Sequence, residues 1–348
     1  MNRRKFISSG AKLVAGAALG SLTPGCFFDD PVHQNSIWTY CEDTDRTGPS
    51  SGKYCTPLNN GITWSNHRLV VPLNASGTGW DVTSAENPNV IKDGNLYRMW
   101  YTGFVSPNWA LLYCESLDGI NWFNHQIAMT PGASGTGFDT LGVGFVTVMK
   151  EASVYRIWIS MRDASIWRIV YAESSDGYTW SNYQQALTIL SQGTFDSLHV
   201  FYPSVIKDGS VYKMWYTGHN GNQRIIYCDS VDGINWQNFT LSVDIAASGL
   251  GFDNIHSTLP CVIRDNSSYK MWYSGGFGAG GRIIYCESQD GISWSNFQLS
   301  IDINSSGTGV DSSSVGNSSV INENGVGKVW YSAATATIAG QILYAESF

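Results

Sequence analysis

The residues best suited to chemistry are those that break a repeating pattern. An Asp recurs at Asp81, Asp139, Asp196, Asp253 and Asp311, so equivalent positions can be compared between copies. Three residues further on stand Ser84, Gly142, His199, His256 and Ser314, and five further on stand Glu86, Gly144, Phe201, Thr258 and Gly316. At these positions a carboxylate occurs in one copy and a histidine in two, and these are groups that donate, accept or transfer protons.

A second set of positions is counted back from a Tyr of the expected third strand. This Tyr recurs at Tyr113, Tyr171, Tyr227, Tyr285 and Tyr344. Four residues before this Tyr stand Trp109, Trp167, Gln223, Gly281 and Gly340, and three before it stand Ala110, Arg168, Arg224, Arg282 and Gln341. Indole faces stack on the C–H faces of sugars, while His, Arg and carboxylate groups bond to their hydroxyls. We therefore expect a saccharide to contact Trp109, Trp167, Arg168, His199, His256, Arg224 and Arg282. The alternatives are packing over loops for the two Trp residues and a hydrogen-bonded structural role for the two His residues.

Glu86 and Asp163 are the copy-specific acids expected near these groups. Hydrolysis of a glycosidic bond ordinarily needs two carboxyl groups. Glu86 would then be the general base of an inverting reaction, and Asp163 the acid or an orienting group. The alternative is that Glu86 only bonds to nearby backbone.

The elements that position these residues are short strands. The stretch PSVIKDGSVYKMWYTG followed by RIIYCDSVDGINW alternates apolar and polar residues around Asp-Gly turns, which predicts a four-stranded antiparallel meander. Its second-strand Trp recurs at Trp100, Trp158, Trp215, Trp272 and Trp330. A period near 50 residues with four strands per copy is typical of propeller blades. We expect an all-β, five-bladed β-propeller.

The chain ends predict how the ring closes. The last copy stops at Phe348 before a fourth strand, whereas NNGITW at Asn59 to Trp64 precedes every complete copy. We expect this N-terminal strand to complete the last blade. SLDGINW at Ser116 to Trp122 recurs in every copy, so its Asp is expected to shape a turn. The variable loops, and hence the ligand site, are expected at the opposite face, around the central funnel.

The first residues read as an export signal. Arg3 and Arg4 precede an apolar run that is too short to span a bilayer, so residues 1–26 are expected to be a twin-arginine signal. Cys26 resembles a lipoprotein cleavage site, and lipidation stays open. Residues 27–57 are expected to form a leader with a Cys41–Cys55 disulfide, and 58–348 the propeller. The protein would be exported, periplasmic or at the surface, with or without an anchor at Cys26.

The composition and net charge exclude some classes of binding partner. The net charge is −8 and there is no basic run, which argues against nucleic acid. We expect an oligo- or polysaccharide partner, no transmembrane span and a monomer. Cys114, Cys228 and Cys286 share a position that holds Ala172 and Ala345 in other copies, which is typical of inert buried thiols. No metal site or cofactor is predicted, although an ion in the channel stays open.

VIKDGSVYKMWYTG with RIIYCDSVDGINW resembles the blades of the five-bladed glycoside hydrolase superfamily that includes arabinanases, β-xylosidases, invertases and levansucrases. The resemblance implies an acid immediately before the Pro of an early first strand, and acids at the equivalent places in later blades. Those places hold Asn87, Phe145, Tyr202, Leu259 and Asn317. Three functions follow: a saccharide-binding propeller of hydrolase ancestry, an active glycosidase using Glu86, or a protein-binding surface scaffold. The first is our leading interpretation.

Overall fold

The computed structural model describes residues 61–276 and 280–347. The export signal, Cys26 and the Cys41–Cys55 pair lie outside the described residues. Within this part of the chain all regular structure is β, in twenty strands, and no helix occurs. No helix there has the length and apolar character that a membrane span requires. Leu58–Phe348 form one compact unit. The expectation of an all-β fold is confirmed.

The strands group into repeats of four, which we number along the chain. Repeat 1 holds β2 (Ser84–Asp93), β3 (Leu96–Val105), β4 (Asn108–Ser116) and β5 (Trp122–Met129). Repeat 2 holds β6 (Gly142–Glu151), β7 (Val154–Arg162), β8 (Trp167–Ser174) and β9 (Ser181–Leu187). Repeat 3 holds β10 (His199–Asp208), β11 (Val211–His219), β12 (Gln223–Ser230) and β13 (Gln237–Val243). Repeat 4 holds β14 (Ser257–Asp265), β15 (Ser268–Gly275), β16 (Arg282–Ser288) and β17 (Ser295–Ile301). Repeat 5 holds β18 (Ser314–Glu323), β19 (Val326–Ala334), β20 (Gln341–Glu346) and, from the start of the described chain, β1 (Ser65–Val71).

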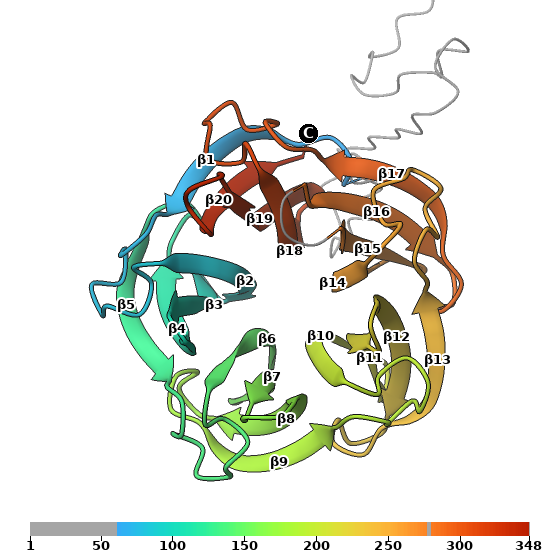
Figure 1. The fold of residues 1–348 in the computed structure, drawn as a ribbon. Helices are drawn as coiled ribbons and strands as arrows, with labels where there is room; N and C mark the ends of the chain where they lie inside the picture. The colour runs from blue at the N-terminus through green and yellow to red at the C-terminus, as the bar shows by residue number, and fades with distance from the viewer. Residues whose placement is uncertain (1–60, 277–279, 348) are drawn as a thin grey trace, which may run out of the picture. The chain divides into compact units, whose positions relative to one another are not determined.

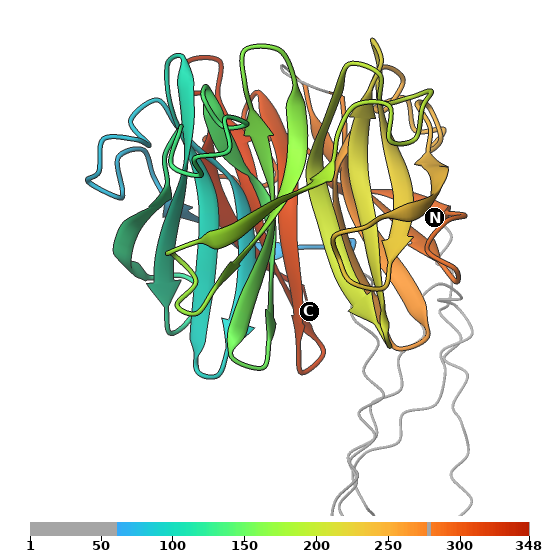
Figure 2. The same ribbon diagram turned by 90° about the horizontal axis from the view of Figure 1, so that it is seen from below.

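The four strands of each repeat pair in antiparallel fashion, as the alternating pattern predicts. Repeats 3, 4 and 5 are separate four-stranded sheets, whereas one parallel pair, Trp109 with Gly142, links repeats 1 and 2 into an eight-stranded sheet. The sheets are arranged around a common centre, with β2, β6, β10, β14 and β18 innermost (Figure 1). These innermost strands contact one another from repeat to repeat, and β18 contacts β2. Seen from the side, the loops gather at two opposite ends of the strands (Figure 2).

The recurring Trp of each second strand joins neighbouring repeats. All five indoles are fully buried. Each Nε1–H donates to a Gly carbonyl in the turn before a fourth strand at 2.7–2.8 Å, the acceptors being Gly177, Gly233, Gly291, Gly61 and Gly119. Because a buried indole N–H must find an acceptor, this contact fixes the distance between neighbouring sheets. The Asp-Gly turns therefore serve packing.

A bulge interrupts every innermost strand at the same place. Asn87, Phe145, Tyr202, Leu259 and Asn317 all have positive φ and coincide with shifts in pairing register. Their backbone N–H groups donate to a Ser or Thr hydroxyl of the preceding repeat at 2.8–3.2 Å, namely Ser332, Thr102, Ser160, Thr217 and Ser274. The bulge leaves this backbone N–H without a partner in its own sheet, and the hydroxyl of the preceding repeat supplies one.

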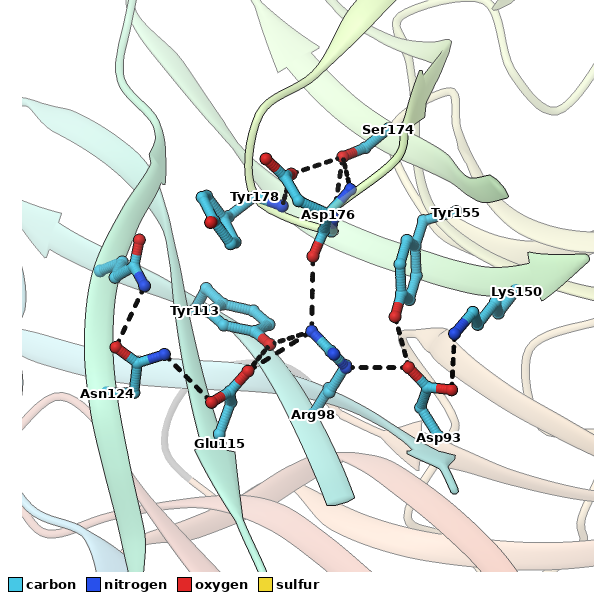
Figure 3. Close-up of polar contacts among 12 residues, drawn as sticks. Asp93, Arg98, Tyr113, Glu115, Asn124, Lys150, Tyr155, Ser174, Asp176 and Tyr178 are labelled. Carbon is cyan, nitrogen blue, oxygen red and sulfur yellow. Dashed lines mark hydrogen bonds and ion pairs between the residues drawn. The ribbon is translucent and has the colours of Figure 1, made fainter. Parts of the chain in front are cut away.

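Polar side chains join the repeats at the end of the strands where β2 and β3 turn (Figure 3). Arg98 lies between Asp93 and Glu115, with its Nε 3.0 Å from Asp93, and Lys150 and Tyr155 of repeat 2 reach the same Asp93. Similar joins occur at Glu151 with Lys207 and Tyr212, at Asp208 with Arg264 and Tyr269, and at Glu323 with Lys92 and Tyr97. Because these groups recur and satisfy one another, we assign them to structure.

Candidate functional site

Two adjoining cavities lie at the inner strands, at the end opposite to the network of Figure 3. One of about 450 Å³ is lined mainly by repeats 1 to 3, and its walls are aromatic and basic. The other, of about 330 Å³, is lined mainly by repeats 4 and 5 with small residues such as Gly276, Gly281 and Gly316. Glu86, Tyr202 and Ala339 line both cavities. We call the first the aromatic cavity and the second the open cavity.

The aromatic cavity brings together the two Trp residues singled out by their spacing. Trp109 is the second residue of β4, the third strand of repeat 1, and Trp167 is the first residue of β8, the third strand of repeat 2. Their ring centroids lie 5.6 Å apart at 67°, an edge-on contact. Trp109 also packs against Phe104 at 4.9 Å and Trp167 against Phe145 at 5.2 Å. Both indoles are only partly buried, so this packing still leaves aromatic surface facing the cavity.

Glu86 stands at the boundary of the two cavities. It lies on β2 beside the bulge at Asn87. Burial raises its pKa from 4.5 to about 7, which a nearby Ser84 hydroxyl partly opposes, and no basic side chain lowers it. Within the described residues Glu86 forms no ion pair. A carboxyl of this kind is half protonated near neutral pH, so it can either give or take a proton.

Tyr202 faces the same carboxyl from repeat 3. Burial raises the pKa of this phenol, and the negative charge of Glu86 raises it further. Gly340 completes the surroundings, because a Cβ built there would stand 2.8 Å from Ser84 Oγ and 3.1 Å from Glu86 Oε2. The absence of a side chain at Gly340 therefore makes room for the Glu86 carboxyl.

His199 also lines the aromatic cavity. Its Nδ1 accepts a hydrogen bond from the backbone N–H of Trp167 at 3.3 Å, which leaves the proton of the neutral ring on Nε2. Its ring stacks on that of His219 with centroids 5.4 Å apart and planes 4° apart. Burial, then His219 and Arg162, lower the pKa of His199, and burial lowers that of His219. Both rings are therefore mainly neutral at pH 7.

Phe104, Arg162 and His219 are cavity residues that the sequence comparison did not single out. All three stand four residues after the recurring second-strand Trp, at the position that Gly276 and Ala334 occupy in repeats 4 and 5. Comparing the copies at this position would have found them. It also explains why the two cavities differ in chemistry, because Phe104, Arg162 and His219 line the aromatic cavity, whereas Gly276 and Ala334 line the open cavity.

The three predicted ligand arginines do not line either cavity. Arg168, Arg224 and Arg282 pack over Phe138, Phe195 and Phe252 and pair with Asp163, Asp244 and Asp302. The reason is strand alternation: Arg168 follows Trp167 directly, and successive side chains point to opposite faces. Their expected role in substrate binding is not supported by this placement.

Asp163 and His256 also lie outside the cavity linings. Oδ1 of Asp163 accepts from the N–H groups of Ser165 and Ile166, and Oδ2 pairs with Arg168 at 2.7 Å. Burial alone would raise the pKa of Asp163, but these bonds outweigh it and lower the pKa, which is unsuited to a proton donor. His256 Nδ1 accepts from the backbone N–H of Gln223 at 3.2 Å. The structure brings Glu86, Trp109, Trp167 and His199 together.

No metal centre is evident in the described part of the chain, where no three His, Cys, Asp or Glu side chains are grouped closely enough to hold an ion. The cysteines at 114, 228 and 286 are buried free thiols whose pKa burial raises, which suits packing and not reactivity.

No protein-family model matches the sequence. The uncharacterized protein MT1551 of Mycobacterium tuberculosis (strain CDC 1551 / Oshkosh) is 27% identical over 220 residues, which cover 58% of this chain and 72% of that protein. A thermostable family-43 glycoside hydrolase has a TM-score of 0.62 at 17% identity, over 75% of this chain and 88% of its own. The β-1,2-mannobiose phosphorylase of Listeria innocua has a TM-score of 0.65 at 11% identity, over 81% and 96%.

The fold is that of the glycoside hydrolase propellers. The GH62 α-L-arabinofuranosidase domain of Coprinopsis cinerea agrees, with a TM-score of 0.59 at 9% identity over 82% of this chain and 97% of its own. At such identities the likeness extends to the propeller fold alone, and the activity must be argued from the cavity residues.

Proposed function

We propose that this protein is a five-bladed propeller that binds a saccharide in its central funnel. The observation that carries the proposal is the aromatic cavity, where two partly exposed indoles lie beside Glu86, Arg162, His199 and Gln223. Flat apolar faces next to a few convergent polar groups are what a sugar ring requires. The open cavity next to it gives room for further sugar units.

Three contacts support a ring of five blades closed by the N-terminal strand. β1 pairs antiparallel with β20, Trp272 of repeat 4 donates to Gly61, and the N–H of Asn87 donates to Ser332 of repeat 5. The first contact matches the pairing of the third and fourth strands within the other repeats, and the other two match contacts between repeats that are consecutive in sequence. The chain ends thus take the places of a continuous fifth blade, which protects the edge strand.

The binding proposal is tested with a panel of immobilised plant, fungal and bacterial oligosaccharides. We expect selective binding by the wild-type protein and at least a tenfold loss in Trp109→Ala and Trp167→Ala. Trp122→Phe, at the start of an outermost strand, is the control and should bind as wild type. Binding that persists in both cavity variants would refute the assignment of the site.

Hydrolysis is the second candidate function, because burial brings the pKa of Glu86 to about 7. No other carboxylate lines either cavity among the described residues, so the two-carboxylate arrangement of ordinary glycosidases lacks a second member. We infer that binding is the better supported function. Turnover of aryl glycosides by wild type that is abolished in Glu86→Gln would reverse this order.

We also propose that the protein is exported, periplasmic or at the surface, and that it acts as a monomer. The support is Arg3-Arg4 before an apolar run, and the candidate lipidation site at Cys26. Cell fractionation tests it: Arg3→Lys with Arg4→Lys should leave the protein in the cytoplasm, and Cys26→Ser should release it from membranes if it is lipidated.

A further inference from the structure

Arg162 carries a charge that the protein does not balance. Every other arginine that the structure describes forms an ion pair, except Arg68, which is exposed on β1. Arg162 is partly buried at the end of β7, lines the aromatic cavity and has no carboxylate within ion-pair distance. A partly desolvated guanidinium without a counter-ion costs free energy that an anionic ligand would recover.

The surroundings of Arg162 hold it in place and leave its hydrogen-bond donors unused. Its guanidinium carbon lies 5.4 Å from the ring centroid of Trp109 and 5.8 Å from that of Trp167. These cation–π contacts are not hydrogen bonds, and none of the Arg162 N–H groups donates to a described residue. Its planar fork of donors therefore remains available, and such a fork matches a carboxylate or phosphate with two parallel bonds.

Three further polar groups line the same cavity. His199 presents an Nε2–H, because its Nδ1 is occupied by the Trp167 amide. His219 stacks on His199. Gln223 is only 9% exposed, lines the cavity, and its Oε1 has no hydrogen-bond partner. A buried carbonyl oxygen without a donor is costly in the free protein, which indicates that a hydroxyl of the ligand, and not its anionic oxygens, bonds to Gln223 Oε1.

We propose that Arg162, His199 and His219 form a subsite for an oxyanion that belongs to, or binds together with, the saccharide, and that Gln223 Oε1 accepts a hydrogen bond from a neighbouring sugar hydroxyl. The inference rests on the proposed saccharide-binding function and narrows its ligand class. The oxyanion is either a carboxylate carried by the sugar, as in a uronic acid, or free phosphate bound beside a neutral sugar. Both present the oxygen pair that the guanidinium fork accepts.

The position of Glu86, the acidic residue that lines the cavities, is consistent with an oxyanion at Arg162. Glu86 forms no ion pair with Arg162, and its pKa is raised with no lowering by any basic group. The cationic and the acidic groups thus act on separate parts of the ligand. An oxyanion at Arg162 would leave the next sugar unit to extend past Glu86 and Tyr202 into the open cavity.

The test measures binding by tryptophan fluorescence and calorimetry, because Trp109 and Trp167 contact the proposed subsite. The probes are sodium phosphate, a set of uronate oligosaccharides, and their neutral counterparts with and without phosphate. The variants are Arg162→Gln, Arg162→Lys, and Arg68→Gln as a control that removes the same charge at an exposed site. Thermal unfolding verifies that each variant is folded.

A carried carboxylate is indicated when a uronate oligosaccharide binds at least tenfold more tightly than its neutral counterpart. Free phosphate is indicated when phosphate binds alone or strengthens the neutral sugar. In either case Arg162→Gln should lose about 10- to 100-fold in affinity, Arg162→Lys less, and Arg68→Gln nothing.

The two proposals fail in different ways. Tight binding of neutral sugars only, lost in Trp109→Ala but unchanged in Arg162→Gln, overturns the oxyanion subsite and leaves saccharide binding intact. Phosphate binding that depends on Arg162, without binding of any sugar, keeps the subsite and overturns saccharide binding. No difference between wild type and Arg162→Gln with any probe overturns the subsite.

Discussion

Replacing Glu86 by Gln should stabilise the protein, but only above acidic pH. Burial raises the pKa of this carboxyl from 4.5 to about 7 in the folded state. The unfolded chain therefore releases the proton more readily, and the free energy of unfolding falls as pH rises from about 4.5 through 7, then levels off. Gln keeps the shape and cannot ionise. The two proteins should be equally stable at pH 4 and differ most at pH 8.

The size of the effect follows from the displacement of the pKa. A change from 4.5 to about 7 corresponds to about 3 kcal/mol at most, and because the carboxyl is partly open to the cavities we expect about 2 kcal/mol. For a unit of this length that is a rise in Tm of about 3 °C at pH 8. Differential scanning calorimetry between pH 4 and 9 measures it.

A matched variant has the opposite sign. Glu173 accepts hydrogen bonds from Tyr171 and Asn182, and the Tyr171 bond foremost lowers its pKa. Glu173→Gln should therefore be less stable than wild type at pH 7, and the deficit should vanish as pH falls through the folded-state pKa. A stability difference between Glu86→Gln and wild type that does not change with pH would refute the reasoning.

Three further predictions concern the frame and the site. Trp272→Phe and Trp215→Phe should each lower the free energy of unfolding by about 2 kcal/mol, since both lose an indole hydrogen bond to a Gly carbonyl. Urea unfolding measures this loss. A much smaller loss for Trp272→Phe than for Trp215→Phe would contradict closure by the N-terminal strand. Asp118→Asn should lose about 1 kcal/mol of stability without changing saccharide affinity, because its carboxylate accepts two backbone N–H groups of a turn far from the cavities. Gly340→Ala should weaken saccharide binding at least fivefold with little change in Tm, because the added methyl displaces Glu86, and unchanged affinity would exclude Glu86 from the site.

The fold could be predicted from sequence because its determinants are local and repeated. The Asp-Gly turns, the alternating strands and the five evenly spaced Trp residues each specify the same four-stranded sheet, and the structure confirms such sheets. The bulges could not be predicted in this way. Phe145, Tyr202 and Leu259 have positive φ although such residues disfavour it, and the hydrogen bond to a hydroxyl of the preceding repeat compensates for part of that cost.

The site could be predicted in part. Copy-specific residues next to the opening Asp and the recurring Tyr indicated Glu86, Trp109, Trp167 and His199, which share one cavity. Strand alternation places Arg168 on the opposite face from Trp167, and Arg168, Arg224 and Arg282 lie outside both cavity linings. Arg162 escaped notice because counting began from the Asp and the Tyr. Arg162 stands four residues after the second-strand Trp158, at the end of β7 that borders the aromatic cavity.

The five bulges on the innermost strands share one backbone conformation but carry different side chains. At each of the five bulges a neighbouring hydroxyl accepts from the main-chain N–H, and this bond does not depend on which side chain the bulge residue carries. Asn, Phe, Tyr and Leu all occupy this conformation within a single molecule. New ligand specificities could therefore be engineered by exchanging one bulge residue at a time, while the Ser or Thr hydroxyl that accepts from its backbone N–H is kept.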